Sequence, residues 1–304
     1  MTVHRITPVP VTSIPRHPDR AAESHKGDYG RVLILAGSRG MAGAAALSGL
    51  GALRGGAGLV TVACPETVAD VVTGIEPGLM TRPLPTTGGH LIDHRDGHWL
   101  ADLDDLKPDV WAVGPGLGRS EAAQRAVQEL WESCEEPAVF DADALNALAD
   151  QGGDWADPPA DAARVLTPHP GEFMRLLIGS DMQPEEDFEW TPENRESLAT
   201  MFAREHNVVL LLKGSRTLVT DGERLFENRT GNPGMASGGC GDVLTGLIAA
   251  LIGQGMEPFE AACCGAHLHG RAGDLAAAEL SQPGMIASDL PRFLATAFAD
   301  PGYD

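Results

Sequence analysis

Short, continuous apolar runs recur along this chain, and each passes into a glycine-rich or polar turn. Arg31 to Ala36 is such a run; it ends in Gly37 to Gly40, and the next segment, Ala42 to Arg54, has the small residues of a closely packed helix. The pattern of a short strand recurs in these further stretches: Gly55 to Ala63, Val110 to Val113, Ala138 to Phe140, Val165 to Thr167 and Val208 to Leu212. A helical segment, Glu121 to Cys134, lies between the second and the third of them. Buried strands of parallel sheets are continuously apolar in this way. The alternation predicts an α/β fold with a mostly parallel central sheet and helices on both faces.

Two later regions depart from this alternation. Thr217 to Thr220 and Arg224 to Glu227 flank Asp221-Gly222, which predicts an antiparallel hairpin. Ser180 to Ser197 contains Glu185-Glu186-Asp187 and two prolines but no apolar periodicity, and we interpret it as a solvated connection or lid. With 304 residues, no internal repeat and no separating linker, the chain is expected to form a single domain.

The chain is strongly acidic. Its formal net charge is −21, and its lysines are Lys26, Lys107 and Lys213. A surface with such a negative field repels polyanions, so we expect neither nucleic acid nor an anionic membrane as a partner. Because dense salt screens the self-repulsion of such a surface, the charge also favours the hypothesis of a salt-adapted host.

Neither a targeting segment nor a cysteine-based site is visible. Met1 to Asp19 is rich in proline and lacks a continuous apolar core, and no stretch approaches the length of a transmembrane helix, so a cytoplasmic location is predicted. The cysteines form no C-x-x-C pair, which argues against a zinc site or a disulfide scaffold and favours buried free thiols. They are Cys64, Cys134, Cys240, Cys263 and Cys264.

The motif that says most about function runs from Asn232 to Gly246. Glycines at 238, 239 and 241 let the backbone approach a ligand closely, and the apolar helix that follows directs unpaired N–H groups and its positive dipole end to the same point. Such a loop suits a nucleotide phosphate. Asp242, at the junction, can accept a proton from a hydroxyl group that faces the phosphate, or it can merely cap the helix. The residues alone leave both interpretations open.

Polar or glycine-rich residues also follow the other predicted strands. They are found in Gly114 to Gly118, Asp141 to Asn146, Thr167 to Glu172 and Lys213 to Thr217. Ligands bind at the carboxyl ends of the strands in open parallel sheets. We therefore expect these segments and the loop that ends in Asp242 to converge on one edge of the sheet.

Single side chains in these segments have alternative interpretations. Lys213 follows an apolar strand and can attract phosphate, or it can be a solvated lysine at a strand end. His169, between two prolines, can contact a ligand or be a hydrogen-bonded loop histidine. Asp141 and Asp143 can cap the next helix or orient a magnesium ion and its waters, with capping the preferred interpretation for Asp143.

A histidine pair in the C-terminal region is interpreted as structural. His267 and His269 are two residues apart in an alanine-rich helical segment, so they cannot share a helix face. This spacing argues against a paired metal site.

Taken in order, the motifs resemble those of the NAD(P)H-hydrate dehydratases, which belong to the ribokinase-like superfamily. The series is KGDYG from Lys26, AGS from Ala36, GPGLG, DADALN, TPHPGE, KG-x-x-T and GGCGD. The resemblance implies a ribokinase-like domain over residues 26–304 after an N-terminal extension over residues 1–25. Many family members also carry an epimerase domain, for which the segment before Lys26 is too short, so a separate epimerase is expected to supply that activity.

The resemblance implies an enzyme, a carbon-oxygen lyase that repairs hydrated NADH or NADPH. The ring hydroxyl is phosphorylated by ADP (or ATP), and phosphate is then eliminated; with ADP, the products from the donor are AMP and phosphate. The implied cofactor is Mg²⁺. The expected assembly is a homotetramer. One alternative is a small-molecule kinase of the same superfamily, of the hydroxyethylthiazole or hydroxymethylpyrimidine type. Another is a nucleotide-binding regulatory protein without turnover.

The family pattern also implies roles for single residues. Asp242 is the implied catalytic base. The implied contacts to the hydrated dinucleotide are Gly43, Ala44, Gly116, His169 and Asp242. The implied contacts to the nucleotide are Lys213, Gly214, Ser215, Arg216, Thr217, Gly238, Gly239 and Gly241. No residue is assigned as a metal ligand.

Overall fold

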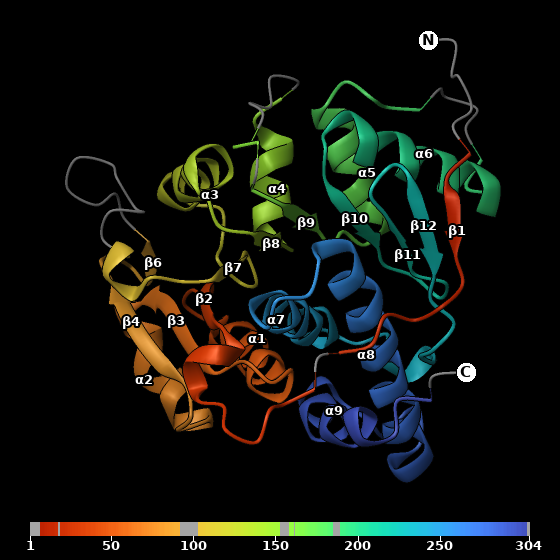
Figure 1. Ribbon diagram of the computed structural model, residues 1–304. Coiled ribbons are helices and arrows are strands. Elements are labelled where there is room, and N and C mark those ends of the chain that lie inside the picture. Colours follow the sequence, from red (N-terminus) through yellow and green to blue (C-terminus); the bar gives the residue numbers. More distant parts are fainter. Residues whose placement is uncertain are drawn as a thin grey trace.

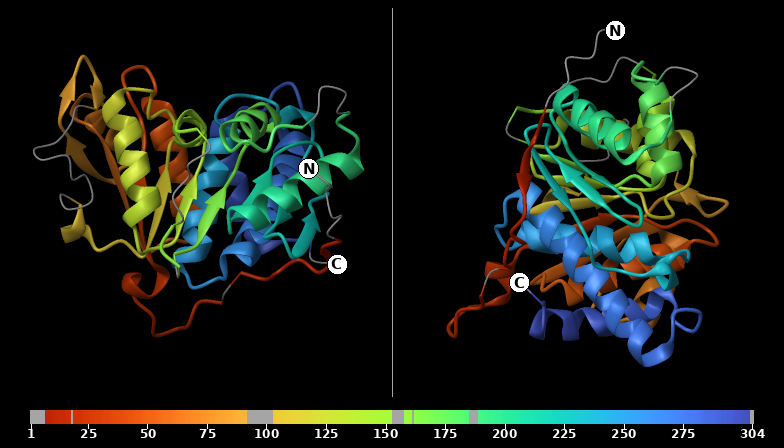
Figure 2. Two further views of the ribbon diagram at one scale, coloured as in Figure 1. Left: turned by 90° about the horizontal axis from the view of Figure 1, so that it is seen from above. Right: turned by 90° about the vertical axis from the view of Figure 1, so that its right-hand side faces the viewer.

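A ten-stranded sheet forms the centre of the molecule, and helices cover both of its faces (Figure 1; Figure 2). The computed structural model describes residues 7–17, 19–91, 103–152, 158–160, 162–184 and 189–302. The strands of this sheet are β1 Val9–Val11, β2 Arg31–Leu35, β3 Leu59–Pro65, β4 Met80–Leu84, β7 Val110–Val113, β8 Ala138–Phe140, β9 Arg164–Leu166, β10 Val209–Leu212, β11 Leu218–Thr220 and β12 Arg224–Glu227. A short separate hairpin is formed by β5 Thr86–Thr87 and β6 His90–Leu91.

The strand order is β1-β12-β11-β10-β9-β8-β7-β2-β3-β4. Neighbouring strands are parallel except where β11 pairs with β10 and β12. This order confirms the predicted mostly parallel sheet and the predicted hairpin around Asp221-Gly222. β1, in the segment expected to be an extension, pairs with β12 at the edge of the sheet, with Val9 opposite Arg224.

The helices fall into two groups, one on each face of the sheet (Figure 1). One face carries α1 Ala42–Arg54, α2 Glu66–Ile75, α7 Cys240–Gly253, α8 Pro258–Leu280 and α9 Leu290–Ala299. The other carries α3 Glu121–Ser133, α4 Asp143–Asp150, α5 Pro170–Gly179 and α6 Pro192–Glu205. Alternate residues of β2 supply the two cores: Val32 and Ile34 face the first group, and Leu33 and Leu35 face the second. Among the described residues, no helix is both long and apolar enough to cross a membrane.

Two of the expected boundaries were wrong. β3 begins at Leu59 rather than at Gly55, because Gly55 ends α1 and Gly56 turns the chain with a φ of +95°. The solvated connection expected up to Ser197 ends earlier: Thr191 accepts a hydrogen bond from the backbone of Asn194, and α6 begins at Pro192. The acidic run Glu185-Glu186-Asp187 lies outside the described residues.

Helices α1 and α7 approach each other closely enough for backbone contact. A Cβ atom added at Gly246 would lie 1.8 Å from the carbonyl oxygen of Ser48, and one added at Gly51 would lie 2.2 Å from that of Val243. The crossing therefore requires glycine on both helices. It also fixes the first turn of α7 beside α1, since a Cβ atom at Gly239 would lie 2.7 Å from Cδ1 of Leu47.

We predict that Gly246→Ala lowers the free energy of unfolding by about 1–3 kcal/mol, because the methyl group must displace backbone rather than a mobile side chain. Urea unfolding of the purified variant measures this. The matched control is Gly74→Ala in α2, where no atom lies within 4 Å of an added Cβ. That exposed helical position should gain about 0.5–1 kcal/mol from the same change. Equal effects in the two variants would contradict the packing account.

Candidate functional site

The candidate site lies at the carboxyl ends of the parallel strands. β8 leads through Asp141 into α4, β9 leads through His169 into α5, and β10 ends at Lys213. The N-termini of α1 and α7 reach the same edge from the first helical face. Several helices thus direct their positive dipole ends to one region, which favours bound anions. The predicted convergence of strand ends is confirmed.

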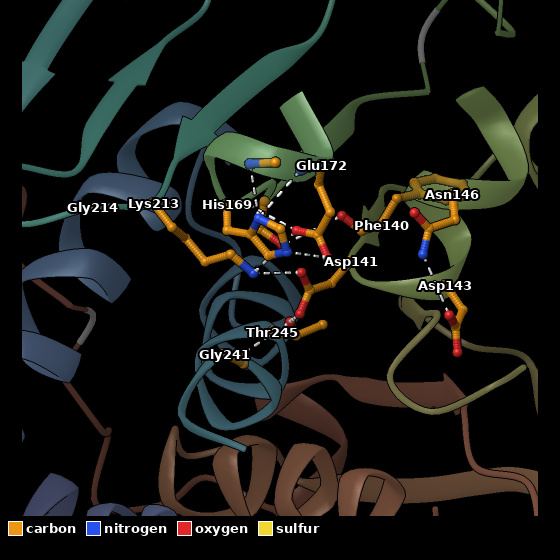
Figure 3. Close-up of polar contacts among 12 residues, drawn as sticks. Phe140, Asp141, Asp143, Asn146, His169, Glu172, Lys213, Gly214, Gly241 and Thr245 are labelled. Carbon is orange, nitrogen blue, oxygen red and sulfur yellow. Dashed lines mark hydrogen bonds and ion pairs between the residues drawn. The ribbon is translucent and has the colours of Figure 1, made fainter. Parts of the chain in front are cut away.

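A buried ion pair is the centre of the site (Figure 3). Nζ of Lys213 lies 2.8 Å from Oδ1 of Asp141, and the hydroxyl of Thr245 donates to Oδ2 of the same carboxylate at 2.7 Å. The pair joins the ends of β8 and β10, and Thr245 adds the second turn of α7. The solvated-lysine interpretation of Lys213 is wrong, since its side chain is 21% exposed and paired with a buried carboxylate.

The charges of this pair stabilise each other. Burial opposes ionisation of Asp141, but Lys213 and the hydrogen bond from Thr245 hold its pKa below the usual value. Burial likewise opposes the charge of Lys213, and Asp141, Glu172 and Asp242 together raise its pKa above the usual value. Both groups are therefore charged at neutral pH.

His169 forms the start of α5 rather than a free loop. Its Nδ1 accepts hydrogen bonds from the backbone N–H groups of Gly171 and Glu172 at 3.0 and 3.2 Å. Glu172 accepts in return from the backbone N–H of His169 at 2.8 Å, which completes a capping box with Pro170 at the first position. Because Nδ1 is an acceptor, the proton of a neutral His169 lies on Nε2. Glu172 also lies 3.8 Å from Nζ of Lys213, so this cap extends the central charge network.

Asp143 does not cap α4 as expected. Its Oδ2 accepts from the backbone N–H of Gly118 at 2.8 Å, so it fixes the glycine loop after β7 instead. Ala142, between the two aspartates, has a φ of +51° and a ψ of −114°. This conformation is unfavourable for a residue with a Cβ atom. It directs Asp141 toward Lys213 while Asp143 points away (Figure 3).

A cavity of about 700 Å³ opens beside the ion pair. One wall is the loop after β10, and the other is the segment that leads into α7. Of the residues assigned to ligands from the sequence, the cavity is lined by His169, Lys213, Gly214, Ser215, Thr217, Gly238 and Gly241. The Lys213 ammonium and the first turn of α7 both border this cavity and lie close together, since a Cβ atom at Gly241 would lie 3.2 Å from Nζ of Lys213.

The remaining assigned residues lie outside this cavity. Gly43 and Ala44 are in the first turn of α1, and a Cβ atom at Gly116 would lie 3.0 Å from Cβ of Ala44, so these three positions are neighbours. Asp242, Arg216 and Gly239 do not line the cavity either. The role of Gly43, Ala44 and Gly116 in binding a dinucleotide stays a prediction.

Asp242 is the third residue of α7, and Gly239 rather than Asp242 is the N-cap. Burial raises the pKa of Asp242 to about 7, and the charge of Asp141 adds to the effect while Lys213 opposes it. A carboxyl group with a pKa near neutrality is suited to accept and release a proton during turnover. Asp242 is therefore not the cap of α7, and its role as a general base stays a prediction.

His269 also lies at the candidate site, although no pattern in the sequence placed it there. It is buried, it lines the cavity, and its Nε2–H donates to the backbone carbonyl of Cys240 at 2.8 Å. Burial lowers its pKa to about 4, so the ring is neutral at pH 7. His267 instead contacts the carbonyl of Pro301 at 2.7 Å, as expected for residues on different faces.

Thr245 was also missed, although its position one turn after Gly241 was a usable signal.

Comparison with known proteins gives consistent results. A family model described as NAD(P)H-hydrate dehydratase matches residues 32–295. The bifunctional NAD(P)H-hydrate repair enzyme Nnr of Moorella thermoacetica is 46% identical over 288 residues, which cover 91% of this chain and 51% of that protein. The chain thus spans about half the length of the curated relatives it matches.

Two solved structures share the fold. An ADP/ATP-dependent NAD(P)H-hydrate dehydratase from Bacillus subtilis, co-crystallised with ATP/Mg²⁺, is similar with a TM-score of 0.75 and 29% identity over 94% of both chains. A ribokinase-like superfamily protein from Enterococcus faecalis has a TM-score of 0.75 at 24% identity, covering 95% of this chain and 93% of that one. The predicted ribokinase-like fold is confirmed.

We predict that Asp242→Asn stabilises the protein, and does so more at high pH. A carboxyl group whose pKa rises on folding binds its proton more tightly in the native state, so native stability falls as the pH rises from about 4 to about 7. The amide removes this penalty. Urea unfolding at pH 8 should show a gain of at least about 1 kcal/mol that shrinks toward pH 5. A gain that is equal at both pH values would contradict the raised pKa.

Proposed function

The chain belongs to the NAD(P)H-hydrate dehydratase family, and from this membership and the site we propose that it restores NADH or NADPH from their hydrates in a nucleotide-driven dehydration. The observation that supports the proposal most is the position of Asp242. It places a carboxyl group of raised pKa at the N-terminus of a helix, beside a cavity in which Lys213 and glycine amides can hold a phosphate. Such an arrangement is suited to phosphorylate a hydroxyl group.

The proposed reaction has two steps. In the first step, the oxygen of the ring hydroxyl bonds to the terminal phosphorus of the nucleotide, and Asp242 accepts the hydroxyl proton. The bond from that phosphorus to the rest of the nucleotide breaks at the same time. The carbon–oxygen bond then breaks, phosphate leaves with the electron pair, and loss of a proton from the adjacent ring carbon restores the dihydronicotinamide. With ADP as donor, AMP and phosphate are released. Lys213 and the amides of Gly238 to Gly241 stabilise the charge that builds up on the phosphoryl oxygens.

The residues of the site are compatible with Mg²⁺. Mg²⁺ prefers oxygen ligands and usually keeps several waters while it binds substrate phosphates and one or two carboxylates. In the part of the chain that the structure describes, no cluster of three or more potential ligands is present. We propose that Asp141, with the nucleotide phosphates and waters, would hold a Mg²⁺ ion that enters with the nucleotide, and that this ion would neutralise phosphate charge. ATP as an alternative donor is supported by the B. subtilis dehydratase, which was co-crystallised with ATP/Mg²⁺.

The dinucleotide is proposed to bind on the side of Asp242 away from the cavity. Gly43 is exposed in the first turn of α1, and the buried Ala44 and Gly116 lie next to it, with the exposed Met41 beside Gly116. Ser38 fixes the loop by donating to the carbonyl of Gly116 at 2.8 Å. His169 would contact the substrate from the cavity side. We propose that residues 26–304 form the catalytic domain, to which β1 adds an edge strand.

Two features of the assembly also stay proposals. An epimerase activity is expected to act together with this enzyme, because the curated relatives are named bifunctional repair enzymes. The homotetramer predicted from the sequence is retained.

The experiment that tests the function is return of dihydronicotinamide absorbance. Purified protein is mixed with enzymatically hydrated NADH, Mg²⁺ and either ADP or ATP. Recovery that requires a nucleotide would support the proposal and identify the donor. Failure with both nucleotides, while either one still binds, would contradict it; a stable phosphorylated alcohol formed from a thiazole or pyrimidine substrate would then favour the kinase alternative.

We predict that Asp242→Ala lowers turnover by about 10²- to 10⁴-fold, the usual contribution of a general base, while nucleotide affinity changes little. Steady-state rates and calorimetric titration with ADP measure the two effects separately. Asp70→Asn, an exposed acidic position in α2, serves as the control with unchanged rates. Near-wild-type turnover in Asp242→Ala would exclude the base assignment.

A further inference from the structure

Arg195 lies behind the loop Lys213 to Thr217, in the segment for which the sequence predicted a solvated connection. It is in the first turns of α6 and reaches across to the end of β10. Its Nη2 donates to the carbonyl of Leu212 at 3.3 Å and to the carbonyl of Arg216 at 3.0 Å. One guanidinium nitrogen thus connects the two ends of the loop.

The loop is also closed from within. The hydroxyl of Thr217 donates to the carbonyl of Gly214 at 3.1 Å and accepts from its backbone N–H at 3.3 Å. A Cβ atom at Gly214 would lie 2.9 Å from Nη2 of Arg195, so the guanidinium packs directly against this glycine. The opposite side of the loop faces the cavity, through Lys213, Gly214, Ser215 and Thr217. Arg195 therefore supports the loop on the side away from the ligand.

The position of Arg195 is unfavourable for a charge. Burial lowers the pKa of its guanidinium, and the charge of Glu227 opposes this effect. A partly buried cation is costly to desolvate, and the hydrogen bonds to the carbonyls of Leu212 and Arg216 offset part of this cost.

The surroundings of Arg195 are unusually basic for this chain. Glu227 pairs with Arg216 at 3.5 Å and with Arg229 at 3.6 Å. Three arginines therefore gather around one carboxylate, next to a cavity that also contains Lys213, in a chain with a net charge of −21. Lys213 is paired with Asp141 and lies 3.8 Å from Glu172, so the local excess of positive charge is that of the three arginines around Glu227. This excess opposes the repulsion of phosphate by the rest of the surface.

We propose that Arg195 is a positioning residue for nucleotide binding. It holds both ends of the loop Lys213 to Thr217, so that this loop presents its backbone and the Lys213 ammonium to the phosphates, and it adds a fixed positive charge behind the loop. The inference rests on the proposed function to the extent that this loop binds the nucleotide.

The test compares Arg195→Met with the wild-type protein. Methionine keeps an unbranched apolar stem of similar reach but has neither the charge nor the donors. Calorimetric titration with ADP and with ATP, each with Mg²⁺, should show a dissociation constant raised about tenfold or more, the usual effect of losing hydrogen bonds from a charged donor. The KM for hydrated NADH should change less than about twofold, since a dinucleotide bound beyond Asp242 does not contact this loop.

Two further variants complete the design. Arg195→Lys keeps the charge without the planar guanidinium and should recover part of the affinity. Arg204→Gln removes an exposed arginine from the last turn of the same helix and should bind nucleotide as the wild type does. Thermal melting of each variant verifies folding; if Arg195→Met is unfolded, Arg195→Lys is the test, with a nucleotide dissociation constant above the wild-type value expected.

Unchanged nucleotide affinity in the folded Arg195 variants would overturn the inference, as would equal increases of KM for both substrates. Direct titration also separates this inference from the proposed function. If the wild-type protein binds nucleotide but does not repair hydrated NADH, the proposed function fails, while weaker binding by Arg195→Met would still support the role of Arg195.

Discussion

The buried ion pair between Lys213 and Asp141 is the interaction on which the site depends. Its partners are 72 residues apart in the sequence, and Thr245 is 104 residues from Asp141. Their contacts therefore fix the ends of two parallel strands against the helix that carries Asp242. Loss of either charged partner would leave a buried charge without compensation, which is usually strongly destabilising. The stability of the fold and the geometry of the site therefore depend on the same ion pair.

The same pair explains how one small region can hold an anion and provide a base. Lys213 and the N-terminus of α7 make the cavity attractive to phosphate. Burial makes ionised Asp242 less favourable, and the negative charge of Asp141 adds to this effect while Lys213 opposes it. The proposed proton acceptor and the proposed anion site would therefore lie side by side. Glu172 lies near Lys213 and accepts a hydrogen bond from His169, so it connects the ion pair to the start of α5. Asp143 accepts a hydrogen bond from the glycine loop after β7.

Much of this arrangement was predictable from the sequence. Buried parallel strands are continuously apolar and end in polar or glycine residues, so β2, β7 and β8 and their site-facing loops could be located from local pattern alone. What the sequence did not reveal depends on contacts between distant segments. Arg195 donates to the carbonyl of Leu212 at the end of β10, and His269 donates to the carbonyl of Cys240, 29 residues away. The strained turn at Ala142 directs the aspartates on either side of it to different partners. Local periodicity contains no information about such contacts.

The central claim is that burial, to which the charge of Asp141 adds and which Lys213 opposes, sets Asp242 as a base that is active near neutral pH. The pH dependence of kcat/KM for hydrated NADH at saturating nucleotide tests this claim most directly, because it follows the ionisation of the enzyme before that substrate binds. The account predicts a rate that falls about tenfold per pH unit below an inflection near pH 7. A profile that stays flat down to about pH 5, as an ordinary aspartate would give, would contradict it.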